Sequence, residues 1–204
     1  MKKIFYFLFV ILTVFFGYIA ASEADWAEAR DFSEGQLRTI ARQVVNSAQG
    51  EWRLESHIIP SHAQDDALNA GSQGNAPKSY FRLQNHDLDT YRNILNYAID
   101  NGEVVIGQEN SPKRFSILAL IPNNELANFG AKENASIGAW MRGADYKQVS
   151  KIKAVFSVIN MRDDMANLSV GNLIAGMENM NQINPNKRPG DLITLFPIPN
   201  NWNK

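Results

Sequence analysis

The sequence has 204 residues, a formal net charge of −1 and no cysteine. Without cysteine the protein has no disulfide scaffold, no thiol catalysis and no cysteine-ligated metal, so its fold must rest on packing. The charge balance makes nucleic acid unlikely as the main partner, because nucleic-acid-binding domains carry an excess of basic residues on one surface.

The N-terminus has the three-part pattern of a secretory signal peptide. Lys2 and Lys3 make it cationic, an apolar stretch follows, and small residues occur at Ala20, Ala21 and Ser22. We expect residues 1–22 to be removed and residues 23–204 to form one exported domain, periplasmic or secreted. The alternative is an uncleaved anchor, because the uncharged stretch is close to the minimum that spans a bilayer. Residues 1–22 would then be the only part in contact with the membrane.

The first predicted element is an amphipathic helix over residues 34–48. Apolar residues recur there at the i, i+3, i+4, i+7 spacing of a buried helix face. Ser33 and Gln36 match a capping box at its start, and Gly50 suits its C-terminal end.

Two less regular segments follow. Residues 51–62 predict a short extended segment, because Pro60 disfavours a helix. Residues 63–79 are dominated by small and polar side chains, which bury little surface, and they predict a flexible surface loop.

A second helix is predicted over residues 88–99, with Asp87 as its N-cap. The aliphatic runs 103–107 and 114–121 come next, and the turn residues between them indicate an antiparallel hairpin. The second run has apolar residues on both faces, which favours a central strand.

The remaining elements are less clearly patterned. Residues 146–161 fit both a helix and a strand, and we predict a helix first and a strand after Lys153. The other predicted elements are helical turns around Leu126 and 137–141, a helix over 170–180 and a closing strand over 192–196. Together these elements predict an α+β single domain. A small antiparallel sheet, made of the hairpin near 103–121 and the C-terminal strand, is packed by several amphipathic helices.

The candidate catalytic residues are the three histidines, His57, His62 and His86. A fold that gathers them around the 63–79 loop would supply a general base or metal ligands, with the metal unknown. The alternative is that they are surface or hydrogen-bonding histidines.

No nucleophile elbow, P-loop or dinucleotide motif occurs in the sequence, so no cofactor is expected. Acid–base cleavage of a phosphodiester by two histidines with Lys78 or Arg82 is compatible with the residue types alone.

Trp140 and Arg142 are the candidate binding residues, because they lie in a glycine-rich region where an exposed aromatic and an arginine can contact a partner. The alternative is that Trp140 caps the hydrophobic core.

The tail from Asn181 to Pro199 is similar to the second half of a LysM module, a small peptidoglycan-binding unit. The similarity rests on Asn184-Pro185, the Pro189-Gly190 turn and Ile198-Pro199. It implies a turn before a closing strand, with peptidoglycan as a possible ligand, although the Gly-Asp usual after the first strand of that family is missing. The alternative is an ordinary Pro-Gly turn.

The sequence therefore favours a non-catalytic binding protein of the bacterial envelope or exterior, with an unknown macromolecular partner. The many asparagines and the Lys-Lys start are typical of proteins from AT-rich bacterial genomes. A secreted hydrolase, metal- or histidine-dependent, that uses the histidines around the 63–79 loop is the alternative.

Overall fold

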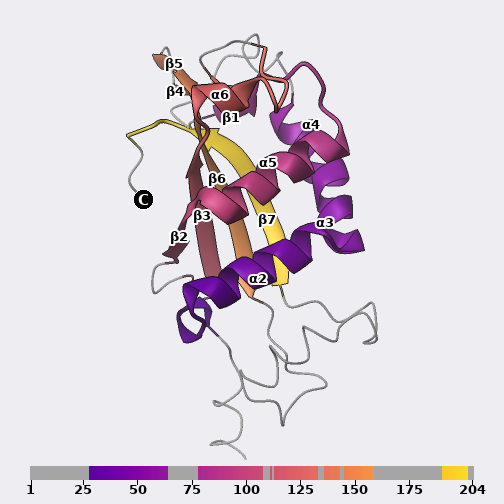
Figure 1. Ribbon diagram of the computed structural model, residues 1–204, viewed down its shortest axis with the longest axis vertical. Helices are drawn as coiled ribbons and strands as arrows, with labels where there is room; N and C mark the ends of the chain where they lie inside the picture. Colours follow the sequence, from indigo (N-terminus) through magenta and orange to yellow (C-terminus); the bar gives the residue numbers. More distant parts are fainter. Residues whose placement is uncertain are drawn as a thin grey trace, which may run out of the picture.

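The computed structural model describes residues 28–63, 78–107, 111, 113–132, 136–142, 145–158 and 190–201. Within them, helices and two antiparallel sheets form an α+β fold, which confirms the predicted class (Figure 1). The signal segment, most of the predicted loop and the predicted helix 170–180 lie outside the described residues. In the ranges that are described, no helix is long and apolar enough to cross a membrane.

The first long helix, α2 (Glu34–Val45), follows a 3₁₀ turn, η1 (Ala29–Asp31). Its start is the predicted capping box. The backbone N–H of Gln36 donates to Ser33 Oγ at 3.4 Å, and that of Ser33 donates to Gln36 Oε1 at 2.7 Å. The capping prediction is therefore confirmed.

The predicted C-terminal end of this helix, at residue 48, is wrong. Helix α2 stops at Val45, with Asn46 as its C-cap, and Ser47 caps a new helix by accepting from Gly50 N–H at 3.1 Å. Gly50 is not a helix stop, because it lies buried inside this second helix. Ser47 provides the cap that the sequence prediction overlooked.

Residues 48–62 form one helical segment, so the extended segment predicted at 51–62 is wrong. The segment consists of α3 (Ala48–Arg53), a π-helical turn η2 (Leu54–Ile58) and α4 (Ile59–His62). Inside a regular α-helix, a proline ring clashes with the carbonyl four residues earlier. Here Ile59 N–H donates to Leu54 O, five residues back, and this wider turn precedes Pro60. The helix therefore continues past the proline.

Helix α5 (Leu88–Asn101) confirms the second predicted helix and extends it by two residues. The Asp87 side chain accepts from Thr90 N–H at 2.7 Å, and this hydrogen bond lowers the pKa of Asp87. Gly102 ends the helix, with its N–H on Ala98 O at 2.7 Å.

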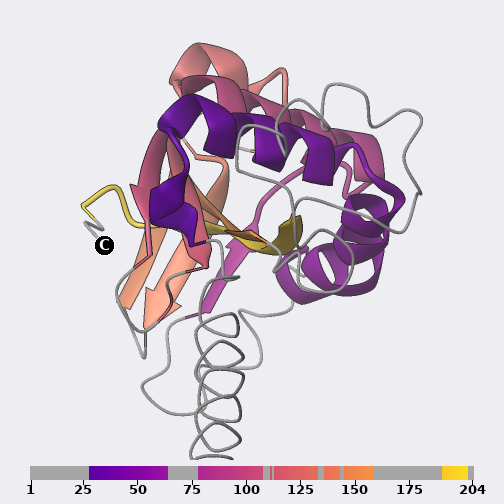
Figure 2. The ribbon, with the colours of Figure 1, turned by 90° about the horizontal axis from the view of Figure 1, so that it is seen from below.

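The large sheet has the strand order β2-β3-β6-β7, and all its neighbours are antiparallel. Its strands are β2 (Glu103–Ile106), β3 (Arg114–Leu120), β6 (Lys151–Val158) and β7 (Gly190–Ile198). The predicted hairpin, the central position of its second strand and the closing strand are confirmed. Helices α2 and α5 lie across one face of this sheet (Figures 1 and 2).

The helix predicted at the start of 146–161 is wrong, because β5 (Asp145–Val149) and β6 occupy this stretch with only Ser150 between them. Alternate residues of β6, among them Ile152, Ala154 and Phe156, are buried in the core. Burial at every second residue is the strand period, and it outweighs the helical spacing of the same apolar residues.

The small sheet has the order β1-β4-β5 and was not predicted. Its first two strands are β1 (Lys78–Phe81) and β4 (Gly138–Arg142). Residues 78–79 belong to β1 and not to the predicted loop, and the predicted turn at 137–141 is mainly strand. The other predicted turn is confirmed as α6 (Asn123–Leu126).

Candidate functional site

His62, the last residue of α4, bridges the two sheets. Its Nδ1 lies 2.9 Å from the carbonyl oxygen of Ser79 on β1, and its ring stacks on Phe196 of β7 with centroids 6.0 Å apart. A carbonyl oxygen only accepts hydrogen bonds, so Nδ1 carries the proton. The Nε2 atom therefore holds the lone pair whenever the ring is neutral.

The surroundings of His62 favour its neutral form. Burial lowers the pKa of His62 from its ordinary value of 6.5, the Ser79 hydrogen bond raises it in part, and the charge of His57 lowers it again. Desolvation penalises the charged ring, and it is the largest of these effects. At pH 7 His62 is therefore mainly a neutral imidazole with a fixed tautomer.

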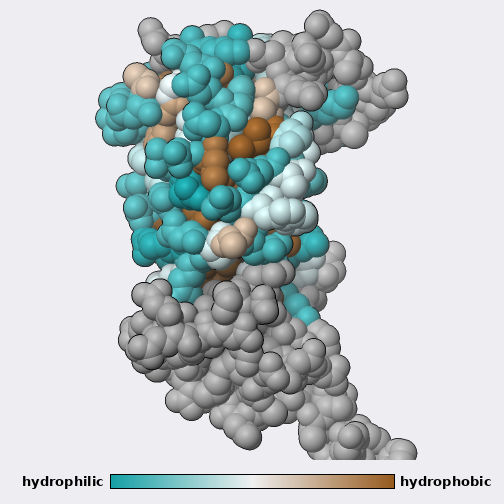
Figure 3. All heavy atoms as spheres, turned by 90° about the vertical axis from the view of Figure 1, so that its right-hand side faces the viewer, coloured by the Kyte–Doolittle hydropathy of each residue, from teal (hydrophilic) through white to brown (hydrophobic). Residues whose placement is uncertain are grey.

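The helix that carries His62 is anchored on β7. Arg53, at the end of α3, donates through Nε and Nη2 to the carbonyl oxygen of Ile193 at 3.2 Å and 3.0 Å. The face of the molecule around α3 and α4 is mainly hydrophilic, with narrow hydrophobic strips (Figure 3). The arginine and the π-helical turn together fix the position from which His62 reaches β1.

The structure brings His57 close enough to His62 for their charges to interact, but it gives His86 a different environment. His57 is exposed on the π-helical turn. His86 Nδ1 lies 3.0 Å from the hydroxyl of Tyr91 on α5, and burial raises the pKa of Tyr91, so that hydroxyl stays protonated. Among the described residues no three His, Asp or Glu side chains form a group that could hold a metal ion.

Trp140 and Arg142, the predicted binding residues, lie on β4, and their register partners lie on β5. Lys147 is the register partner of Trp140, and its Nζ lies 5.7 Å from the centre of the indole ring, a cation–π arrangement. Arg142 pairs in register with Asp145. Register partners and residues two apart point to the same face, so these four side chains share one face of the small sheet. Trp140 is half-buried, whereas the other three are exposed.

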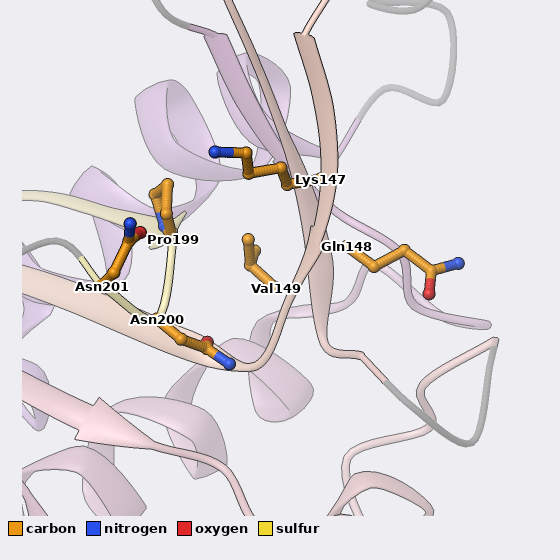
Figure 4. A pocket seen from close by; sticks show the side chains of 6 residues that line it. All are labelled: Lys147, Gln148, Val149, Pro199, Asn200 and Asn201. Carbon is orange, nitrogen blue, oxygen red and sulfur yellow. The ribbon is translucent and has the colours of Figure 1, made fainter.

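A shallow hollow of about 440 Å³ lies beside β5. Figure 4 shows Lys147 and Val149 of β5 pointing toward Pro199, whereas Gln148 points away. The opposite wall consists of Pro199, Asn200 and Asn201, which directly follow β7. Asn200 Oδ1 accepts from Ser150 N–H at 3.4 Å, which ties this wall to the end of β5.

Three residues of these two sites were missing from the sequence predictions: Ser79, Phe196 and Lys147. Ser79 acts through its carbonyl and Phe196 through a stacking contact from a distant strand, so neither leaves a local signal. The alternation of β5 would have placed Lys147 on the face of Val149, had that segment been read as a strand.

The comparisons with known proteins identify no family. No family model matches the chain, and no curated protein matches it. The LysM-like tail therefore stays a resemblance, and its closing strand is one of four in the large sheet. The chain is similar to a chain of the crystal structure of the CdiA-CT/CdiI complex from Y. kristensenii 33638, at 16% identity and a TM-score of 0.36. The match covers 70% of this chain and 99% of that one. At these values, the similarity establishes neither a shared fold nor a shared function.

Proposed function

We propose that this protein is an exported, non-catalytic binding protein that recognises another protein through the face of the small sheet. Export is supported by the signal-peptide pattern of residues 1–22. The observation that carries the binding proposal is the Trp140–Lys147 pair, with Arg142 on the same face and a hollow beside it.

The residue types on this face match those of interface hot spots. Tryptophan and arginine are enriched where partners bind most tightly, because a large flat side chain buries much surface with few rotatable bonds. Trp140 is already held in place by Lys147, so docking a partner on it costs little side-chain entropy.

Affinity capture from envelope and culture fractions, with the mature chain as bait, tests the proposal. We expect a specific protein to be recovered, and Arg142→Ala and Trp140→Ala to weaken its Kd by about 10-fold to 30-fold each. Trp52→Ala is the matched control, because Trp52 is 54% exposed on α3. Its expected effect is below about 3-fold. If no specific protein is recovered, or if only Trp52→Ala weakens binding, the proposal is wrong.

A histidine-dependent hydrolase is the second candidate, and the geometry of His62 favours it. A neutral imidazole with Nδ1 bonded to a carbonyl presents Nε2 as a general base, which can take the proton of an attacking water or hydroxyl. If the purified chain hydrolyses chromogenic esters or phosphodiesters, His62→Gln should lower kcat/KM by about 10²-fold to 10⁴-fold. Full activity in the His57→Gln, His62→Gln and His86→Gln variants would remove this candidate.

The lowered pKa of His62 also predicts a pH dependence of stability. Above the pKa of about 6.5 that His62 has in the unfolded chain, the imidazole is neutral in both the folded and the unfolded protein. Below this pH the imidazole binds a proton in the unfolded chain, whereas in the folded protein it stays neutral to a lower pH. The free energy of unfolding should therefore fall as the pH drops below 6.5, toward the folded pKa, by at most about 1.4 kcal/mol per pH unit from this group. Urea unfolding between pH 5 and 7, taken as roughly the range in which histidine titrates, measures the slope. His62→Gln should reduce it, and His57→Gln should reduce it less. Equal slopes in wild type and His62→Gln would contradict the lowered pKa.

A further inference from the structure

We infer that the outer side of β5 binds an extended, acidic segment of the protein partner as an additional strand of the small sheet. This inference rests on the proposed binding function and names where and how the partner docks. Strand addition uses the unpaired backbone N–H and C=O groups of a sheet edge, and side-chain contacts on either face supply the specificity.

Of the described edge strands β1, β5, β2 and β7, β5 combines a row of four exposed residues with the hollow beside it, whereas β2 is exposed only at its two ends. The small sheet ends on one side at β1, which contacts α4 and β7, and on the other side at β5. In the large sheet, the edge strand β7 is covered by α3, which is bonded to it through Arg53. Residues 145–148 of β5 are exposed, and no described strand pairs with their outer side. An exposed edge of this kind is a template for one more strand.

The hollow beside β5 provides places for the side chains of a bound strand. Its floor includes Lys147 and Val149, which lie two residues apart and point to the same side (Figure 4). A strand laid along β5 would direct every second side chain into this hollow. The apolar Val149 and Pro199 favour an aliphatic side chain at one position, and the Lys147 ammonium group favours a carboxylate at the next.

The charges of the small sheet favour an acidic segment. Residues 78–82 and the strands β4 and β5 contain four basic side chains, Lys78, Arg82, Arg142 and Lys147, against one acidic side chain, Asp145. The whole chain has a net charge of −1, so this excess is local. Opposite charges across an interface speed association and set the orientation of the partner.

Two other occupants fit less well. A nucleic acid would be attracted by the positive charge but has no peptide groups to continue the hydrogen-bond ladder of β5. A second copy of this chain offers along its own β5 only one carboxylate, Asp145, together with another Lys147, so it neutralises the basic side chains less fully than an acidic segment does. An acidic polypeptide segment satisfies both the backbone and the charge.

Site-specific photocrosslinking of the full chain in the producing cells tests this inference. The probe is p-benzoylphenylalanine in place of Tyr146 on β5, and the control is the same probe in place of Trp52. Both residues are exposed aromatics, at 43% and 54%. We expect the probe at position 146 to label a protein, and mass spectrometry to map the label to an extended acidic segment. Lys147→Glu should lower the yield by about 5-fold or more, whereas Arg114→Glu, on β3, should change it less than about 2-fold.

The other outcomes separate this inference from the proposed function. A protein that is captured and whose binding Trp140→Ala weakens, but that is not labelled from position 146, would keep the proposed function and overturn docking on β5. Labelling of RNA or of a second copy of the chain at position 146 would also overturn the inference. Labelling from position 52 alone would contradict both docking on β5 and the proposed binding through the small sheet. Strand addition further requires that the amides of 145–149 exchange with deuterium more slowly in the complex, and unchanged exchange would exclude it.

Discussion

Truncation of Phe156 to alanine should lower the free energy of unfolding by about 3–5 kcal/mol, because it removes a ring from the centre of the core. Phe156 is fully buried in β6 and stacks on Phe115 of β3 with ring centroids 5.3 Å apart and an interplanar angle of 17°. A paired ring adds about 0.5–1.5 kcal/mol to the value of its buried area.

Urea unfolding of the wild type and the Phe156→Ala variant measures this loss. Leu120→Ala is the control, since Leu120 belongs to the neighbouring strand but is 58% exposed, and its expected effect is within about 0.5 kcal/mol. A loss below about 2 kcal/mol for Phe156→Ala would mean that the space left by the ring is refilled or that β6 is not central.

Two glycines of the N-terminal helices should respond in opposite directions to the same substitution. A Cβ on Gly50 would lie 2.1 Å from Val44 O and 3.0 Å from Val44 C, which are backbone atoms of the preceding helix. Gly50→Ala must therefore open the junction between α2 and α3, at an expected cost of about 1–3 kcal/mol or more.

Gly35, in the first turn of α2, has nothing within 4 Å of an added Cβ. Gly35→Ala should therefore stabilise the protein by about 0.4–1 kcal/mol, because alanine loses less backbone entropy than glycine on folding. Thermal unfolding of both variants checks the pair. A neutral Gly50→Ala would show that the two helices are not in close contact at this point.

The sequence predicted best those elements whose signals are local. The capping box of Ser33 and Gln36, the Asp87 cap and the aliphatic hairpin all depend on neighbours within a few residues. The small sheet could not be predicted in this way, because β1 pairs with β4, which lies about 60 residues along the chain. The four or five residues of each strand carry too little pattern to show that pairing.

For the candidate site, too, the sequence predicted what depends on local signals and missed what depends on distant residues. The histidines, Trp140 and Arg142 were singled out from their residue types alone. Which of them have partners depends on non-local contacts, such as Ser79 for His62 and Lys147 for Trp140. The error at Pro60 had a local cause, since the rule that proline ends a helix assumes four-residue hydrogen bonding, and a π-helical turn does not meet that assumption.

The π-helical turn also sets the direction, around the helix axis, in which each later residue of the helical segment points. Successive residues of an α-helix are rotated by about 100°, and a π-helical turn holds one residue more than a regular turn. Shortening Leu54–Ile58 by one residue, to a regular turn, would rotate the imidazole of His62 by about that angle, away from Ser79 and Phe196. The direction of the His62 side chain thus depends on the number of residues in the preceding π-helical turn. Insertions or deletions in that turn would alter the site without changing any residue in it.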